Sequence, residues 1–142
     1  MKSYNASFVL SSAERTEVTD ITTLLRDLVR ESEIATGIAL MSTLHTTCAL
    51  LVNEFQNALI CDLRSLMETL VPERAGYRHD DPRVSDCERG NACAHLRAAL
   101  FGRNVALGVT HGELTLGPYQ SVIFAEFDGP RKRHITLQVL GE

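Results

Sequence analysis

His45, Thr46 and Thr47 are the first residues of the sequence whose types suit chemistry. They follow one another between two apolar runs, residues 37–44 and 48–52. An imidazole can bind a metal or transfer a proton, and hydroxyls beside it can bind phosphate or water. A hydrogen-bonded structural histidine is the alternative that these residue types leave open. The segment is therefore the first candidate site.

Cys93 and His95 form the second candidate. A thiolate and an imidazole are both ligands of zinc. Side chains two positions apart on a helix do not face each other, so the pair could share one metal only if the helix began after Cys93. The alternative is that Cys93 is a small buried residue of the core.

Two carboxylates, Glu126 and Glu54, are the third feature. Glu126 interrupts the apolar run of residues 121–127, and the basic residues 131–133 could supply the cation that an inward carboxylate needs. Glu126 then has two possible roles. It forms a structural ion pair, within the chain or between subunits, or it is a carboxylate of a functional site. Glu54 stands at the head of a predicted helix, where it either favours the helix dipole or takes part in catalysis.

An α+β domain that spans residues 1–142 is predicted to position these candidates. Apolar alternation and short apolar runs predict strands, and apolar residues three and four apart predict three helices. The order of elements does not alternate strand and helix, so we expect antiparallel or mixed β-sheet layers in a single domain. The predicted strands are residues 4–10, 37–44, 48–52, 104–109, 113–116, 121–127 and 134–140, and the predicted helices are residues 18–32, 54–70 and 91–102.

Capping and turn residues predict where these elements begin and end. Thr19 or Asp20 can cap the first helix. Asn53 is predicted to cap the second, with Gln56 as the returning half of a capping box. The turn at residues 128–132, DGPRK, is predicted to join the last two strands as a hairpin.

Two further segments carry expectations about the surroundings of the sheet. The run from Val122 to Phe127 is apolar on both faces, so we expect helices or another subunit to cover both sides of its sheet. Residues 72–90 form a long polar segment, and such loops in compact domains are often functional.

Composition excludes several classes of protein. The net charge of −4 at pH 7 argues against nucleic acid as the main partner, because phosphate backbones require a basic face. No apolar stretch approaches the roughly 20 residues of a membrane span, and the N-terminal segment lacks the pattern of an export signal. The four cysteines form no CxxC pair, so reduced thiols in the cytoplasm are expected. Motifs of nucleotide-binding loops and serine hydrolases are absent.

Five segments together resemble the YjbQ-like family. They are HTTCALLVNE, YRHDD, DCERGNACAHLRAALFG, GELTLGPYQ and FAEFDGPRKRHITLQVLG, and they span nearly the whole chain. The resemblance implies a small single-domain α+β fold, a homotrimer and, in some members, a weak secondary thiamine-phosphate synthase activity.

The resemblance also implies a polar, histidine-lined pocket that can hold a divalent metal, zinc or magnesium. Carried onto this sequence, the catalytic residues would be His45, Glu54 and Glu126, the substrate-binding residues Thr46, Thr47, Asn53, Gln120 and Arg131, and the metal ligands His45, His95 and Cys93. The sequence departs from the family pattern at Cys93, where relatives often have histidine, and at Tyr119, where they favour tryptophan.

Three functions follow as hypotheses. The first is an enzyme, either a thiamine-phosphate synthase that releases pyrophosphate or a metal-assisted hydrolase. The second is a non-catalytic trimeric protein that binds a small phosphorylated metabolite or a metal. The third is a purely structural trimer, in which changes at His45 and His95 alter stability alone.

Overall fold

Strand β8 (Lys132–Gly141) shows how the sequence builds the larger sheet. Arg133, Ile135, Leu137 and Val139 are buried and alternate with more exposed residues, as the two-residue period of a strand requires. The computed structural model describes residues 1–142. The remaining elements are β1 (Lys2–Ser11), β2 (Glu17–Asp20), α1 (Thr22–Glu31), β3 (Thr36–Thr43), β4 (Cys48–Asn53), α2 (Asn57–Leu70), the 3-10 helix η1 (Arg78–Asp80), α3 (Ala92–Phe101), β5 (Asn104–Thr110), β6 (Glu113–Leu114) and β7 (Ser121–Glu126).

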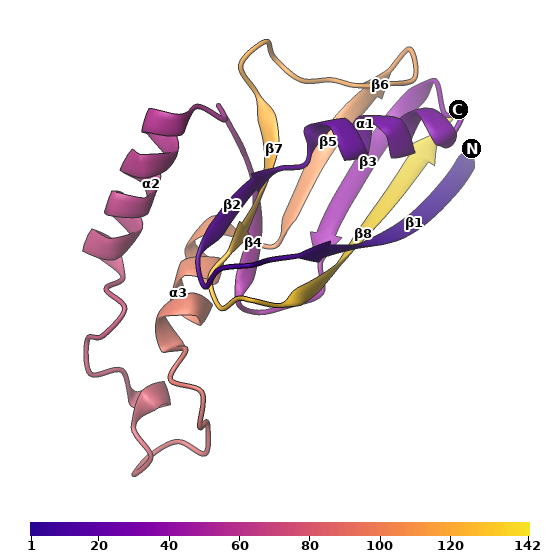
Figure 1. Ribbon diagram of the computed structural model, residues 1–142. Coiled ribbons are helices and arrows are strands. Elements are labelled where there is room, and N and C mark those ends of the chain that lie inside the picture. The colour runs from indigo at the N-terminus through magenta and orange to yellow at the C-terminus, as the bar shows by residue number, and fades with distance from the viewer.

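The strands form two sheets in which every pairing is antiparallel (Figure 1). The five-stranded sheet has the order β1-β8-β3-β5-β6, and the three-stranded sheet has the order β2-β7-β4. The prediction of a single α+β domain with three helices is confirmed, and its sheets are antiparallel throughout.

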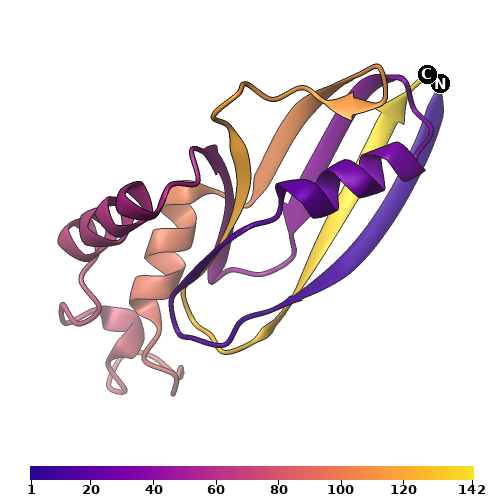
Figure 2. The same ribbon diagram turned by 45° about the horizontal axis from the view of Figure 1, so that its top comes forward.

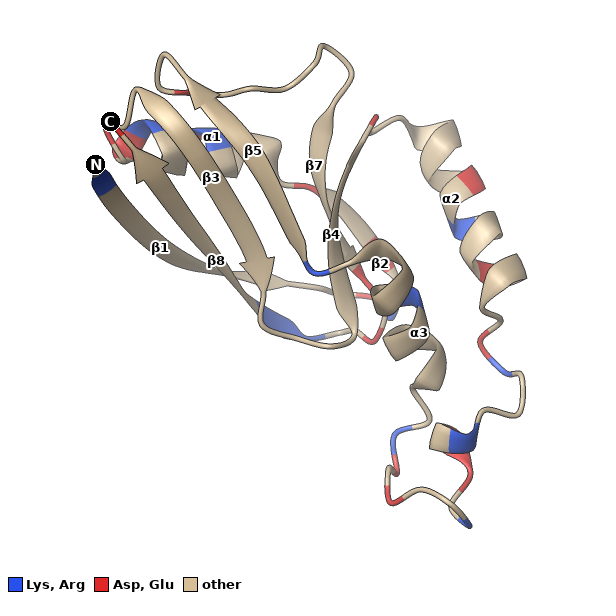
Figure 3. Ribbon diagram, turned by 180° about the vertical axis from the view of Figure 1, so that it is seen from behind, with Lys and Arg blue, Asp and Glu red and all other residues tan.

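Helix α1 and the three-stranded sheet cover the same face of the five-stranded sheet. The main core accordingly joins Leu25 and Val29 of α1 to Leu137 of the larger sheet and Phe124 of the smaller one. Figure 2 shows α1 lying along the larger sheet, while α2 and α3 lie beyond the smaller sheet. No helix in this chain covers the outer face of the five-stranded sheet (Figure 3).

Strand β7 is covered on both faces within one chain. Val122 and Phe124 belong to the main core, whereas Ala125 and Phe127 belong to a second core with Met67 of α2 and residues of α3. The expectation that this sheet is covered on both sides is therefore confirmed, and the cover comes from α2, α3 and the larger sheet.

The predicted hairpin at residues 128–132 is wrong. Strand β7 pairs with β2 and β4, whereas β8 pairs with β1 and β3, so the segment carries the chain from one sheet to the other. The turn residues do reverse the chain. They cannot specify which strand the next one joins, because packing of the two sheets decides that.

Two predicted helix starts also differ. Residues 17–20 form the short strand β2, and Asp20 then accepts a hydrogen bond from the Thr22 main-chain N–H at 2.9 Å. Gln56, not Asn53, caps α2, because its Oε1 accepts from the Leu59 N–H at 2.8 Å. Asn53 ends β4 instead.

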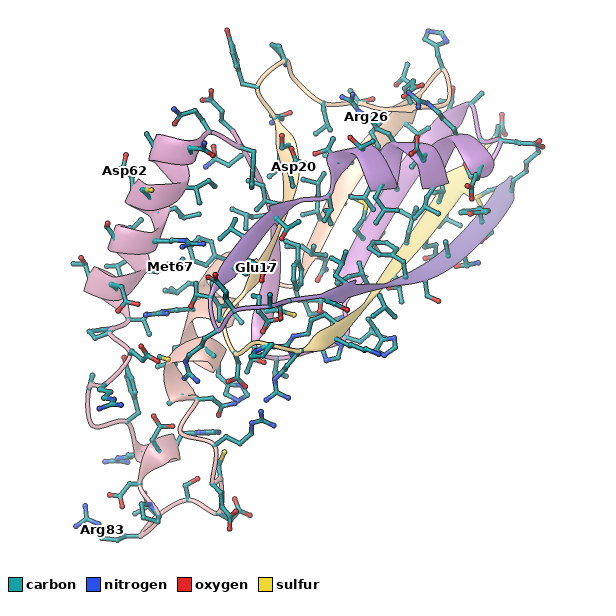
Figure 4. All side chains as sticks on the ribbon, in the orientation of Figure 1. Glu17, Asp20, Arg26, Asp62, Met67 and Arg83 are labelled. Carbon is teal, nitrogen blue, oxygen red and sulfur yellow. The ribbon has the colours of Figure 1, made fainter.

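Residues 72–90 link α2 to α3 and are anchored at two points. Arg97 of α3 is buried and donates two hydrogen bonds to the Val71 carbonyl oxygen, at 3.1 and 2.9 Å. Asp80 of η1 accepts from the Ala92 N–H at 2.9 Å and so satisfies the start of α3. Arg83 lies at the far tip of this segment (Figure 4). None of the helices is long and apolar enough to cross a membrane.

Candidate functional site

His45 lies in the turn between β3 and β4, at the end of the sandwich where β8 begins. Its own N–H donates to the Thr43 hydroxyl at 3.3 Å, and its Nε2 accepts from the His134 main-chain N–H at 2.8 Å. A nitrogen that accepts a hydrogen bond carries no proton, so the neutral ring carries its proton on Nδ1. His45 therefore has Nδ1–H as the side-chain group that can donate a hydrogen bond.

The electrostatic surroundings favour this neutral form. Burial lowers the pKa of His45, and the Arg133 guanidinium and the His134 ring lower it further, although Glu126 acts in the opposite direction. The net pKa is below the ordinary value for histidine. At neutral pH the ring is therefore uncharged, in agreement with the hydrogen bond to Nε2.

His95 projects from α3 toward the same turn. Its ring centre lies 4.9 Å from that of His79, which belongs to η1. Burial lowers the pKa of His95 and His79 adds to this effect, while Asp128, Asp80 and the Thr46 carbonyl raise it. The net pKa is again below the ordinary value, so this second ring is also neutral near pH 7.

Two adjoining hollows share His45, Thr46 and His95 as a common wall. The first, here called the arginine hollow, has a volume of about 350 Å³, and Arg89, Arg131, Arg133, Asn91, Asp128 and Cys87 also line it. The second, here called the alanine hollow, has a volume of about 400 Å³, and Cys48, Ala98, Ala99, Gly102 and Arg103 also line it. Three distant parts of the chain therefore meet around one pair of histidines.

Asp128 organises the arginine hollow. This buried carboxylate accepts from Arg131 Nη2 at 2.8 Å and from Asn91 Nδ2 at 2.9 Å. Arg15 and Arg89 lie at 3.6 and 3.8 Å from its oxygens. One carboxylate thus holds three guanidinium groups close together, because each is attracted to the same charge.

The floor of the arginine hollow is a buried ion pair. Arg133 donates to Glu126 through Nε at 2.7 Å and through Nη2 at 2.5 Å, and Nη2 also donates to the Thr47 hydroxyl at 2.8 Å. Burial lowers the pKa of Arg133, but Glu126 and neighbouring groups more than offset this, so the net pKa is raised. Glu126 Oε1 also accepts from the Asp128 N–H at 3.0 Å. Both oxygens of Glu126 are therefore engaged.

The hollow has a surplus of positive charge. The three arginines around Asp128 have two carboxylate partners, because Glu73 binds Arg15 at 2.7 Å. The buried Glu126–Arg133 pair is neutral as a unit. Three guanidinium charges therefore face two carboxylate charges, which leaves one positive charge without a counterion. Arg89 and Arg131, which share Asp128, both line the hollow. Such a site favours an anion.

The structure brings together five of the residues singled out in the sequence. His45, Thr46, Thr47, His95 and Arg131 all line the arginine hollow. Glu126 lies behind Arg133 and does not line either hollow.

Asn53, Glu54 and Gln120 lie at the other end of the smaller sheet. The register pairs Cys48 with Glu126 but Asn53 with Ser121, and five residues of strand span about 17 Å. Asn53 and Glu54 border a separate hollow of about 360 Å³ beneath α2. Gln120 accepts from the Gly117 N–H at 2.8 Å. One chain therefore does not unite all the predicted site residues in a single pocket.

The predicted metal ligands do not form a metal site within one chain. The chain holds no group of three or more His, Cys, Asp or Glu side chains placed to hold a metal ion. Cys93 is buried, lies beside Arg15 and lines neither hollow, while the Nε2 lone pair of His45 is already used. We therefore derive no chemistry through a metal.

Four residues that shape the hollow were not predicted from the sequence: Arg15, Arg89, Asn91 and Asp128. Asp128 had a usable signal, because it is a carboxylate directly before a basic turn. Arg15, Arg89 and Asn91 belong to segments that are distant in the sequence. They meet only because α3 and the turn at residues 11–16 pack beside residues 128–132, where the chain passes from one sheet to the other.

Fold and site define a class of protein: a single-domain, two-sheet α+β protein with a histidine- and arginine-lined hollow at one end of its sandwich. A family model described as "UPF0047 protein YjbQ-like" matches residues 6–142, and the chain belongs to this family.

Several relatives agree with this assignment over nearly their full length. A UPF0047 protein of Archaeoglobus fulgidus is 41% identical over 92% of this chain and 97% of its own. The UPF0047 protein YugU of Bacillus subtilis is 30% identical over 93% of this chain and 96% of its own. The crystal structure of a YbjQ-like protein of unknown function from Sulfolobus solfataricus P2 is similar, with a TM-score of 0.91 and 33% identity over 99% of both chains.

Proposed function

We propose that this protein binds a small phosphorylated metabolite in the arginine hollow. The observation that carries the proposal is the convergence of Arg89, Arg131 and Arg133 on one hollow with a surplus positive charge. Guanidinium groups match phosphate oxygens in geometry and form charge-assisted hydrogen bonds with them. The Nδ1–H of His45 adds a neutral donor on the wall of the same hollow.

Titration with inorganic phosphate and pyrophosphate tests this proposal, by calorimetry at low ionic strength. Arg89→Ala removes a guanidinium that is largely exposed, so the fold should persist. We expect it to weaken binding about ten-fold or more, since a hydrogen bond to a charged group contributes roughly 1.5–3 kcal/mol. Arg83→Ala is the matched control, because Arg83 is exposed, pairs with Asp81 and lies at the loop tip (Figure 4). Absence of binding by the natural protein, or equal losses in both variants, would refute the proposal.

A thiamine-phosphate synthase activity is the enzymatic candidate. The guanidinium groups of the arginine hollow could stabilise a leaving pyrophosphate. The carboxylates expected to assist are engaged or remote, because Glu126 binds Arg133 and Glu54 lies at the far end of the sheet. This favours binding over catalysis. The assay is release of pyrophosphate from an aminopyrimidine diphosphate and a thiazole phosphate. If the natural protein releases pyrophosphate and a folded His45→Ala variant does not, catalysis is favoured over binding.

We also propose that α2 and α3 form the contact between copies of the chain in a homotrimer. Leu66 and Leu70 of α2 are 50% and 61% exposed, and Leu96 and Leu100 of α3 are 43% and 62% exposed. Apolar side chains gathered on two neighbouring helices mark an interaction surface.

The four free cysteines suit a reducing compartment, so we propose that the protein is cytoplasmic.

Light scattering after gel filtration tests the assembly. We expect three chains per particle in the natural protein and a single chain after Leu70→Glu with Leu100→Glu. Ile38→Thr is the control, because Ile38 is exposed on the outer face of the five-stranded sheet. A monomeric natural protein, or dissociation caused by the control alone, would contradict this surface.

A further inference from the structure

The alanine hollow has a composition unlike that of the arginine hollow beside it. Four of its eight lining residues are small, Cys48, Ala98, Ala99 and Gly102, and its volume is about 400 Å³. Gly102 follows the last residue of α3 with φ of +89°, a conformation that favours glycine, and the wall therefore stays free of a side chain there.

The alanine hollow also has no carboxylate and no side-chain amide to pair with ligand hydroxyls. Its polar side chains are those of His45, Thr46 and His95, which it shares with the arginine hollow, and that of Arg103. A sugar or polyol needs several such partners for its hydroxyls, because an unpaired polar group loses free energy when it leaves water. The small residues Cys48, Ala98, Ala99 and Gly102 therefore offer a surface that an apolar group can contact.

A phosphate held by the arginines would leave the alanine hollow unfilled. The two hollows share three lining residues, so the second volume lies directly beside the first, across His45, Thr46 and His95. We propose that the ligand is a phosphate monoester whose compact, apolar carbon part lies in the alanine hollow while its phosphate lies among Arg89, Arg131 and Arg133. This inference rests on the proposed phosphate-binding function and names the class of ligand.

Three probes measured side by side on the full chain test the inference. They are inorganic phosphate, phenyl phosphate and glycerol 3-phosphate. We expect phenyl phosphate to bind about ten-fold more tightly than inorganic phosphate, because contact of its ring with the hollow removes apolar surface from water. Glycerol 3-phosphate should gain little, since its hydroxyls find few partners.

A substitution in the alanine hollow locates the gain. Ala99 is exposed and lines this hollow, so Ala99→Phe fills the space without disturbing the core. We expect the affinity ratio of phenyl phosphate to phosphate to fall to about one. Ala58→Phe, at an exposed position on α2, is the control that should keep the ratio of the natural protein. Thermal melting of both variants verifies folding, and Ala99→Leu is the second choice if Ala99→Phe melts early.

The outcomes separate the two proposals. If inorganic phosphate binds but phenyl phosphate gains nothing, or glycerol 3-phosphate gains as much, the ligand class is wrong and the phosphate-binding function stands. If the ratio survives in Ala99→Phe, the carbon part does not lie in the alanine hollow. If none of the three probes binds, both proposals fail.

Discussion

Substitution of Glu126 by glutamine should destabilise the protein strongly. The carboxylate is 0% exposed and the guanidinium of Arg133 is 4% exposed, and two hydrogen bonds of 2.7 and 2.5 Å join them. Glu126→Gln keeps the shape of the side chain but leaves Arg133 as a buried charge without its counterion. Loss of one partner of such a pair costs about 3–5 kcal/mol. For a chain of 142 residues this corresponds to a Tm lower by roughly 10–15 °C.

The double variant Glu126→Gln with Arg133→Met separates charge from shape. It removes both charges, so much of the lost stability should return, because no unpaired buried charge remains and the amide oxygen of the introduced glutamine can still accept from the Asp128 N–H. Urea and thermal unfolding at one fixed protein concentration measure both variants. A Glu126→Gln protein within about 1 kcal/mol of the natural one would refute the reasoning, since the carboxylate would then not be needed to balance Arg133. It would return Glu126 to the candidates for a catalytic role.

The other predictions concern the histidines, the start of α3 and metals. Because the pKa values of His45 and His95 are lowered in the folded state, the unfolded chain binds more protons as the pH falls below about 6.5. Stability should therefore decline on acidification through that range, and less so in His45→Gln with His95→Gln; parallel Tm profiles would contradict this. Asp80→Ala should cost about 1 kcal/mol in urea unfolding through the lost bond to the Ala92 N–H, and an unchanged midpoint would show that water replaces it. Zinc added in excess to the dissociated variant Leu70→Glu with Leu100→Glu should remain at well below one equivalent per chain after gel filtration, because one chain offers no group of three ligands. One equivalent that is lost on adding His45→Ala would show that this ring turns to bind it.

The order of secondary structure elements could be predicted largely from local patterns. The helix at α3 was expected over residues 91–102 and spans Ala92–Phe101, because its residues favour a helix and Gly102 ends it. The short strand β2 was missed. Its residues 17–20 precede a helical pattern without a turn signal, and only pairing with β7 makes them a strand.

The candidate site was predicted in part. His45 and Thr46 stand out because polar residues interrupt apolar strands, a signal that is visible in the sequence. Asn53 and Glu54 belong to the same sequence motif as His45 and Thr46. The length of strand β4 separates the two pairs, so Asn53 and Glu54 line another hollow. Motif proximity in sequence did not mean proximity in space.

The sequence by itself determined the domain class, most of its elements and the two histidines of the shared wall, because periodicity, caps and residue type act over a few neighbouring residues. Tertiary structure alone decided which strands pair across residues 128–132, and thus that Asp128 meets Arg15 and Arg89. It also decided that Glu126 is buried against Arg133. These contacts join residues far apart along the chain, and they depend on how the two sheets and α3 bury their apolar faces together.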